Sequence, residues 1–261
     1  DLEKAEFWYD EMQSNTLREN PYLYYAEGRI ALFEKDFVMA RQALTRADKQ
    51  SDESTLSEKT RYYLSLSDFF AGDFEFAEIQ LKTLERRNTS YYANDAIKLR
   101  MWIKNGLRAD STGSLLETIG SSLYSIHIGN YDEALSQLEP ILAQASHSFT
   151  DDLTLEISSK LPDQYNRLKL QLLSRSIQSQ PHSPLRERLL WDQAIIIESF
   201  LNVNTVPEGS FTYDFLESEP NIEFTRQYLV DLYEELLIEF PNGFYAPFVR
   251  EKLENLETTS T

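Results

Sequence analysis

The stretch FAGDFEFA, residues 70–77, decides the fold. One helical pattern ends at the start of this stretch, and another begins at the end of the stretch. Gly72 suits the left-handed backbone that terminates a helix, and Asp73 suits the cap of the next helix. Phe74 then packs back across the turn, and the small Ala77 lets two helices approach closely. The stretch therefore predicts a hairpin of two antiparallel helices.

The same phrase occurs twice more, as FEKDFVMA at 33–40 and IGNYDEA at 128–134. After each alanine, apolar or small residues follow four and seven positions on. These are Leu44 and Ala47, Leu81 and Leu84, and Leu138 and Ile141. This spacing keeps one apolar stripe along a helix. A repeated hairpin cannot bury its apolar face alone, so the repetition predicts a tandem array in which neighbours stack.

Applied to the whole chain, the same signals predict an all-α solenoid of about thirteen helices. Their expected ranges are 2–14, 21–34, 37–50, 55–71, 74–87, 91–105, 114–128, 131–145, 150–160, 164–180, 184–200, 223–240 and 245–257. We expect one repeat domain over 1–257 and a disordered tail at 258–261. The segment 202–222 has no helical period and forms an irregular insertion. Its alternating aromatics, Phe211, Tyr213 and Phe215, favour an extended path, as either a surface insertion or a loop that contacts a partner.

Composition excludes several classes of function. Lys and Arg number 25 against 43 Asp and Glu, and this net charge of −18 disfavours nucleic acid as a partner. There is no cysteine, so thiolate chemistry and disulfides are excluded. Three isolated histidines and the lack of a Gly-rich phosphate loop predict no metal and no cofactor. No apolar run approaches the length of a transmembrane helix.

Two acidic stretches are candidate chemical sites. Asp110 to Gly113 (DSTG) is similar to a calcium loop, but the alternating acidic ligands are missing. Asp151 and Asp152 stand at an expected helix start, where the helix dipole favours negative charge. Neither stretch predicts catalysis. Most acidic residues are expected on a solvated face, and the alternative is that they steer a basic partner.

The repeat resembles the tetratricopeptide repeat family. The matching small positions are Gly28, Ser65 and Ser122 on first helices, and Ala40, Ala77 and Ala134 on second helices. The phrase EFPN at 239–242, followed by Tyr245 and Ala246, resembles repeat junctions in bacterial envelope members. This similarity favours a periplasmic or envelope location over the cytoplasm. The spacing of 57 residues from Ala77 to Ala134 and the insertion depart from the family pattern.

The resemblance implies a right-handed superhelix whose first helices line a concave groove that binds a protein or peptide. The groove residues it implies are Tyr22, Tyr25, Arg29, Phe33, Tyr62, Leu66, Phe69, Ile119, Leu123 and His127. The alternative for each is a place in the core between repeats. The Lys/Asn/Arg clamp of chaperone-binding members is absent, so an acidic C-terminal peptide is not the expected ligand.

We therefore expect a non-catalytic scaffold or adaptor, and not an enzyme, with a role in a bacterial envelope assembly. Two alternatives remain open. A small-ligand or glycan-binding protein would place Trp8, Trp102 or Trp191 in a pocket. A non-catalytic region of a larger enzyme or complex would have its active site in residues outside this sequence. The sequence does not indicate the partner or the oligomeric state.

Overall fold

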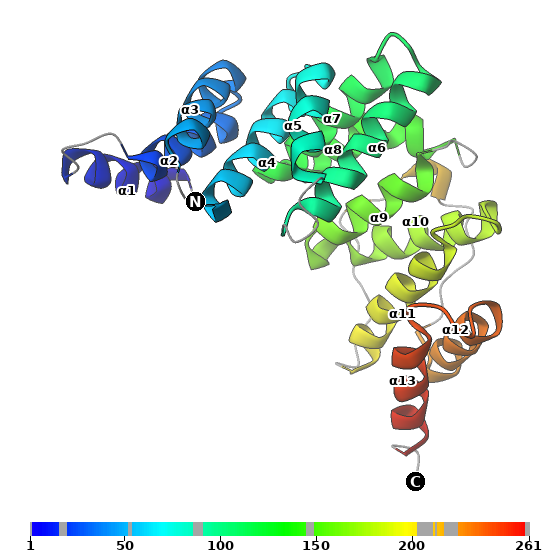
Figure 1. The fold of residues 1–261 in the computed structure, drawn as a ribbon. Helices are drawn as coiled ribbons and strands as arrows, with labels where there is room; N and C mark the ends of the chain where they lie inside the picture. Colours follow the sequence, from blue (N-terminus) through cyan, green and yellow to red (C-terminus); the bar gives the residue numbers. More distant parts are fainter. Residues whose placement is uncertain are drawn as a thin grey trace. The chain divides into compact units, whose positions relative to one another are not determined.

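The computed structural model describes residues 2–15, 20–51, 54–85, 91–144, 149–202, 211, 213–216 and 224–258. Throughout these ranges the secondary structure is helical, with thirteen α-helices and two short 3-10 helices (Figure 1). This confirms the all-α fold with tandem packing of helices. The chain divides into two compact units, residues 1–137 and 138–261, where one repeat domain was expected.

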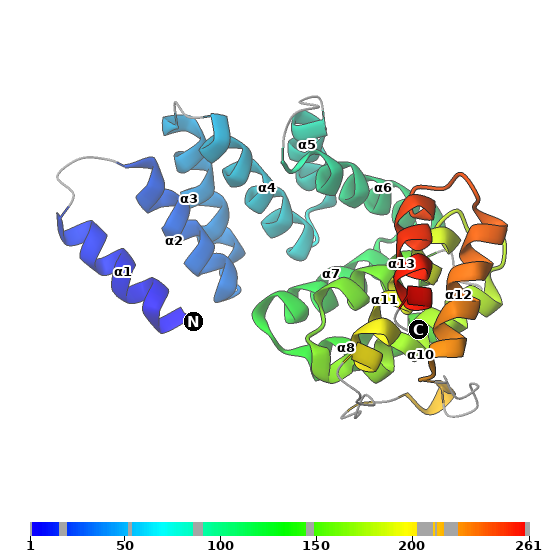
Figure 2. The same cartoon turned by 90° about the horizontal axis from the view of Figure 1, so that it is seen from below.

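In the first unit, each of the helices from the first to the sixth packs on the next in sequence. The helices of this unit are α1 (Leu2–Asn15), α2 (Pro21–Phe33), α3 (Phe37–Gln50), α4 (Ser54–Phe70), α5 (Phe74–Glu85), α6 (Ala93–Ala109), α7 (Ser114–Ile128) and the start of α8 (Tyr131–Leu142). Helix α4 also contacts α7 and α2 (Figure 2). This second layer of contacts closes the core of the unit.

The hairpin turns form as the sequence predicts. Gly72 and Gly129 adopt the left-handed conformation, with φ of +81° and +90°. In the first copy of the phrase Lys35 takes this place, with φ of +68°. Asp36 caps α3, because its carboxylate accepts a hydrogen bond of 2.9 Å from the backbone N–H of Met39.

The small positions of the repeat lie where helices pack closely. Ala40, Ala77 and Ala134 are each 0% exposed. A Cβ atom added to Gly28 would lie 2.6 Å from Cγ of Leu44, well inside van der Waals contact. Helices α2 and α3 can therefore pack this closely only with glycine at that position.

Helix α6 continues beyond its expected end at residue 105. It includes Gly106 and ends at Ala109. A Cβ atom at Gly106 would lie 2.4 Å from Cγ of the fully buried Leu116 of α7. This glycine therefore serves the approach of two helices and does not end one.

The second unit continues the tandem packing. Its elements after α8 are α9 (Thr150–Lys160), η1 (Asp163–Tyr165), α10 (Asn166–Ser179), α11 (Arg186–Asn202), η2 (Asp214–Leu216), α12 (Arg226–Glu239) and α13 (Ala246–Thr258). Helices α9 to α13 each contact the next. Their core includes Leu173, Leu190, Ala194, Tyr233 and Leu236, all 0% exposed.

The insertion predicted at 202–222 lies largely outside the described residues. Where the structure describes it, the chain is not extended. Tyr213 is 2% exposed and stacks on Phe215, with ring centroids 4.9 Å apart, and Leu216 is fully buried in the turn η2. The alternating aromatics therefore anchor a folded turn. Of the tail expected at 258–261, Thr258 is the last residue of α13, and the others lie outside the described ranges.

Candidate functional site

A row of aromatic rings crosses three helical segments of the first unit. Tyr25 of α2 meets Tyr63 of α4 edge-on at 6.0 Å between centroids. Tyr62 contacts Tyr63 at 5.6 Å and stacks on Tyr92, just before α6, at 4.6 Å. We call Tyr25, Tyr62, Tyr63 and Tyr92 the tyrosine cluster. All four are partly exposed, so they offer ring surface to a ligand.

Arg29 lies within this cluster. Its guanidinium carbon lies 3.5 Å from the centroid of the Tyr63 ring, which is a cation–π contact. It also donates a hydrogen bond of 3.0 Å to the Tyr25 hydroxyl. No ion pair of Arg29 occurs among the described residues, whereas other arginines of the chain do form them. Examples are Arg41, Arg61, Arg100 and Arg186.

The environment of Arg29 leaves part of its hydrogen-bonding capacity unused. Its Nε atom is buried and makes no hydrogen bond within the part of the chain described. The planar guanidinium carries five N–H donors in a fixed arrangement. Within the described part of the chain, the tyrosine cluster thus holds a cation that forms no ion pair with a carboxylate, and it holds this cation through Tyr25 and Tyr63.

Tyr25 and Tyr92 keep their protons at neutral pH. Burial, with smaller contributions from neighbouring tyrosines, raises the pKa of Tyr92 to about 12. Burial also raises the pKa of Tyr25, against the opposing effect of Arg29. These two hydroxyls are therefore neutral donors and acceptors, which suits hydrogen bonding to a ligand and not proton abstraction.

A second group of aromatic rings connects α7 to other helices of the first unit. Tyr124 of α7 is 4% exposed, and its hydroxyl donates a hydrogen bond of 2.8 Å to the carbonyl of Phe33. Its ring meets Phe37 and Phe70 edge-on, at 5.5 and 5.7 Å. Phe70 also contacts His127 at 6.0 Å. These rings tie α7 to the turn after α2 and to the end of α4.

The groove residues expected from the sequence separate into two groups. Tyr25, Arg29 and Tyr62 come together in the tyrosine cluster. Phe69, Ile119 and Leu123 are core residues, with exposures of 1%, 0% and 8%, so the groove assignment is wrong for them. They are buried because α7 packs against α4 and covers that face.

The remaining groove residues lie on the expected helices with some surface accessible. Tyr22 is 44% exposed. Phe33, Leu66 and His127 are half-buried. Sequence reasoning missed Tyr63 and Tyr92, which complete the cluster. Their signal was the recurrence of adjacent tyrosines at 24–25, 62–63 and 91–92.

The three tryptophans, which the glycan-binding alternative would place in a pocket, differ in their surroundings. Trp102 is buried at 3% exposure, and Trp8 is 63% exposed. Trp191 stacks on Tyr245 at 4.9 Å. One pocket lies between α1, α2 and α3, and another between α10, α11 and α12, and no tryptophan lines either.

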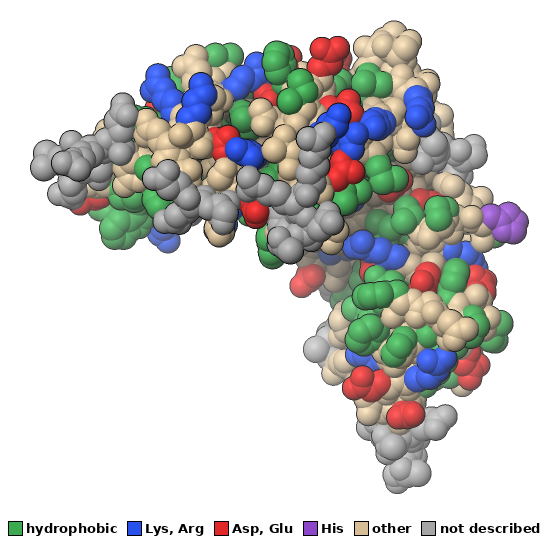
Figure 3. All heavy atoms as spheres, in the orientation of Figure 1, with side chains coloured by type: hydrophobic (Ala, Val, Ile, Leu, Met, Phe, Trp, Pro, Cys, Tyr) green, Lys and Arg blue, Asp and Glu red, His purple; other side chains and the backbone are tan. Residues whose placement is uncertain are grey.

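Charged and hydrophobic side chains are mixed on the face seen in Figure 3. Large apolar side chains are exposed on α1, and also on α12, on α13 and between them. They are Phe7, Trp8 and Met12, and Ile238, Phe244 and Phe248. Among the helices that the structure describes, none is long and apolar enough to cross a membrane.

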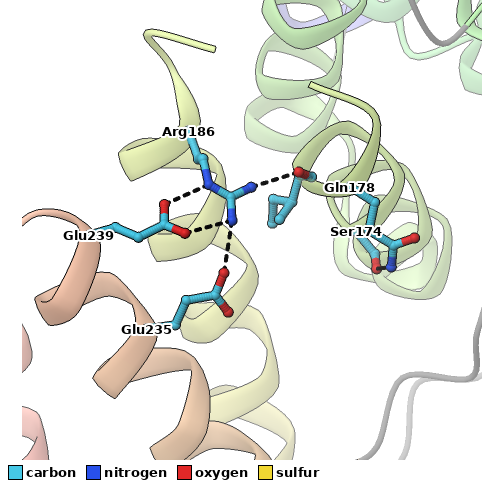
Figure 4. A network of polar contacts seen from close by, with 6 residues as sticks. Ser174, Gln178, Arg186, Glu235 and Glu239 are labelled. Atoms are coloured by element: carbon cyan, nitrogen blue, oxygen red, sulfur yellow. Dashed lines mark hydrogen bonds and ion pairs between the residues drawn. The ribbon is translucent and has the colours of Figure 1, made fainter. Parts of the chain in front are cut away.

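The second unit contains a polar network around Arg186 (Figure 4). This arginine is 8% exposed and donates two hydrogen bonds to Glu239, of 2.6 and 2.9 Å. It also pairs with Glu235 at 2.8 Å and donates to the carbonyl of Ile177 at 2.6 Å. The network joins α10, α11 and α12. Each guanidinium nitrogen has a partner, so its geometry is that of a structural clamp.

The stretch similar to a calcium loop folds as a helix-initiating turn. The Asp110 carboxylate accepts hydrogen bonds from the hydroxyls of Thr112 and Ser114, at 2.6 and 2.7 Å. It also accepts one of 3.1 Å from the backbone N–H of Leu115. Across the described ranges, no group of three His, Asp or Glu side chains is placed to hold a metal ion.

These hydrogen bonds predict a pH dependence. They hold the pKa of Asp110 well below its usual value. A carboxyl with a lowered pKa in the folded state stabilises the fold above its unfolded pKa, and this contribution is lost as pH falls towards the folded pKa. Asp110→Asn should therefore lower the melting temperature at pH 7. The difference from the wild type should shrink towards pH 2. A melting series across this range tests it, and a constant difference would contradict the assignment.

Comparison with protein-family models, with curated proteins and with solved structures finds no match to this chain. The fold itself defines an all-α protein of tandemly packed helices.

Proposed function

We propose that this protein is a non-catalytic scaffold or adaptor of the tetratricopeptide type that binds a protein or peptide through the tyrosine cluster. One observation carries the proposal: the partly exposed cluster of four tyrosines holds Arg29, which has no carboxylate partner among the described residues. Successive hairpins supply the parts of the cluster, since Tyr25 belongs to α2 and Tyr62 to α4. Extended binding surfaces of tandem repeats are assembled in this way.

The chemistry of the cluster suits a polypeptide ligand. Tyrosine offers a large contact area with little rotamer entropy to lose, and tyrosine and arginine are enriched at binding hot spots. The tyrosine hydroxyls can hydrogen-bond to peptide groups, and the Arg29 guanidinium can bind carbonyl oxygens. The cluster includes no carboxylate, imidazole or thiol to act as a base or nucleophile, so binding is the proposed role.

The proposed setting is a bacterial envelope assembly. Its support is the helix junction at residues 239–242, where α12 ends at Glu239 and a short turn leads to α13 at Ala246. Fractionation of cells that express the complete natural gene tests this proposal. Recovery with the cytoplasmic proteins would contradict it.

The test of function is capture of partners by the full chain, with chemical crosslinking and mass spectrometry. A partner should be recovered reproducibly with crosslinks near α2 and α4. After purification, this partner should bind a Tyr62→Ala, Arg29→Gln double variant at least about tenfold more weakly than the wild type. Phe76→Ala is the matched control, since Phe76 is a 57% exposed aromatic outside the cluster.

Two results would contradict the proposal. In one, partners bind the double variant and the wild type equally well. In the other, the purified protein catalyses a reaction that a point mutation abolishes. Circular dichroism of each variant would establish that the fold is retained.

A further inference from the structure

A cavity of about 320 Å³ lies between α10, α11 and α12 of the second unit. Cavities that bind small ligands begin at about this size. Two of the helices each supply three lining residues at helical spacing, i, i+4 and i+7. They are Arg186, Leu190 and Gln193 of α11, and Tyr228, Leu232 and Glu235 of α12. This spacing places each set of three on one face of its helix.

Helices α11 and α12 run antiparallel. Near the start of α11, Arg186 pairs with Glu235, which lies near the end of α12. Near the other end of the pair of helices, the rings of Phe200 and Phe224 meet edge-on, with centroids 5.9 Å apart. These two contacts fix the register between the lining residues of the two helices.

The register gives the cavity two polar ends and an apolar middle. The ion pair between Arg186 and Glu235 stands at the first end. One helical turn away, Leu190 lies level with Leu232. A further turn away, Gln193 stands at the second polar end. The cavity therefore suits a ligand that is polar at both ends and apolar between them.

The first polar end carries an excess of negative charge. One guanidinium, that of Arg186, pairs with the carboxylates of both Glu235 and Glu239 (Figure 4), which gives the three groups a net charge of 1 − 2 = −1. Glu235 uses one oxygen in this pairing, and its other oxygen accepts no hydrogen bond within the described ranges. This end of the cavity thus suits a cation and disfavours an anion.

The second polar end contains a donor without a partner. Gln193 is 2% exposed, and its Nε2 atom makes no hydrogen bond to any described residue. Buried polar side-chain atoms are nearly always hydrogen-bonded, and an unpaired one costs stability. Among the described residues that line this cavity or the one between α1, α2 and α3, only Gln193 has such an atom. An acceptor oxygen that enters the cavity beside Gln193 removes this cost.

We propose that this cavity binds a lysine-like ligand, with an ammonium group at one end, a carbonyl oxygen at the other and an alkyl chain between them. The ammonium pairs with the carboxylate of Glu235, and the carbonyl accepts a hydrogen bond from Gln193. The alkyl chain packs against Leu190 and Leu232. Seven residues of helix separate the two polar ends, a rise of about 10 Å. An extended lysine spans this distance with a hydrogen bond at either end.

The probe for the test is N-acetyl-lysine N-methylamide, a lysine with both ends capped. Its binding to the full chain is followed by saturation-transfer NMR of the ligand. For a ligand of this size we expect a dissociation constant on the order of 1 mM. The capped norleucine, which lacks the ammonium, should bind at least about tenfold more weakly, and so should pentylamine, which lacks the carbonyl. Added salt should weaken binding of the capped lysine.

Gln193→Met separates a binding role from a structural one. Methionine keeps the length of the glutamine side chain but offers no N–H donor. The variant should bind the capped lysine at least about tenfold more weakly. Its melting temperature should equal or exceed that of the wild type, because an unpaired buried donor is removed. A lower melting temperature with unchanged binding would assign Gln193 a structural role and contradict the proposal.

Glu235→Gln tests the first polar end. The substitution keeps an oxygen for Arg186 and removes the charge, so the capped lysine should bind at least about tenfold more weakly, and the capped norleucine should be unaffected. Glu234→Gln is the matched control, since Glu234 is exposed on the same helix and lies outside the lining described. Tyr62→Ala should also leave binding unchanged, so this proposal and the proposed function can fail separately.

Free lysine distinguishes the two sources of this chemistry. Tighter binding of free lysine than of the capped form would assign the cavity to a free amino acid. Equal or tighter binding of the capped form would assign it to a lysine side chain of a protein. Three results would overturn the proposal. Neither form binds at about 10 mM, or capped norleucine binds as well as capped lysine, or Glu235→Gln binds capped lysine as well as the wild type.

Discussion

Replacing Arg186 by alanine should lower the free energy of unfolding by about 3 kcal/mol. The substitution leaves Glu235 and Glu239 facing each other across an emptied site, and it leaves the carbonyl of Ile177 without its donor. The expected loss is at the low end for a buried ion pair, because both glutamates keep partial contact with water. Unfolding in urea, followed by circular dichroism, measures it.

Arg188→Ala is the matched control. Arg188 is on the same helix, its side chain is 52% exposed, and it approaches Asp192 at 3.6 Å. An exposed pair of this kind contributes up to about 1 kcal/mol. Equal losses for the two variants would show that the Arg186 network is not a clamp.

The pH dependence provides an independent check on the same network. The hydrogen bonds from Arg186 lower the pKa of Glu239. Glu239 therefore stabilises the fold above the usual glutamate pKa, and this contribution is lost as pH falls below it. Burial raises the pKa of Glu235. The contribution of Glu235 to stability therefore changes with pH in the opposite direction. Without Arg186 the contribution of Glu239 should disappear. The loss of unfolding free energy caused by Arg186→Ala should therefore be smaller at low pH.

Ala77→Leu should lower the free energy of unfolding by about 1–3 kcal/mol. Ala77 is fully buried where α5 packs with α4, and three extra carbons require either a shift of the helices or a strained rotamer. Ile79→Leu on the same helix is the control, since Ile79 is 61% exposed. Thermal unfolding distinguishes them, and an unchanged melting temperature for Ala77→Leu would mean that the register is wrong.

The sequence was sufficient for the helices and for their turns. Gly72, Gly129 and Asp36 act through backbone conformation and hydrogen bonds within a few residues, and the structure has them as predicted. Gly106 shows the limit of such local reasoning. A glycine at this place is typical of a helix end, yet α6 continues through Gly106. Leu116 of another helix occupies the space beside Gly106, where a larger side chain would not fit.

The candidate site shows the same limit. Tyr62 and Phe69 are about two helical turns apart on α4. From the sequence, each of them could face either a groove or the core. Only the packing of α7 against α4 makes Phe69 a core residue and leaves Tyr62 accessible. Tyr92 joins the cluster from the segment before α6, at a distance in sequence that no helical period relates to Tyr25.

By itself the sequence determined the all-α class, the thirteen helices and the small residues at their crossings, because periodicity, capping and glycine conformation are short-range properties. Only the tertiary structure decided which faces of those helices are covered. The hydrogen bond from Tyr124 to Phe33 joins residues 91 positions apart. Burial depends on such distant partners, and therefore so does the accessibility of the tyrosine cluster.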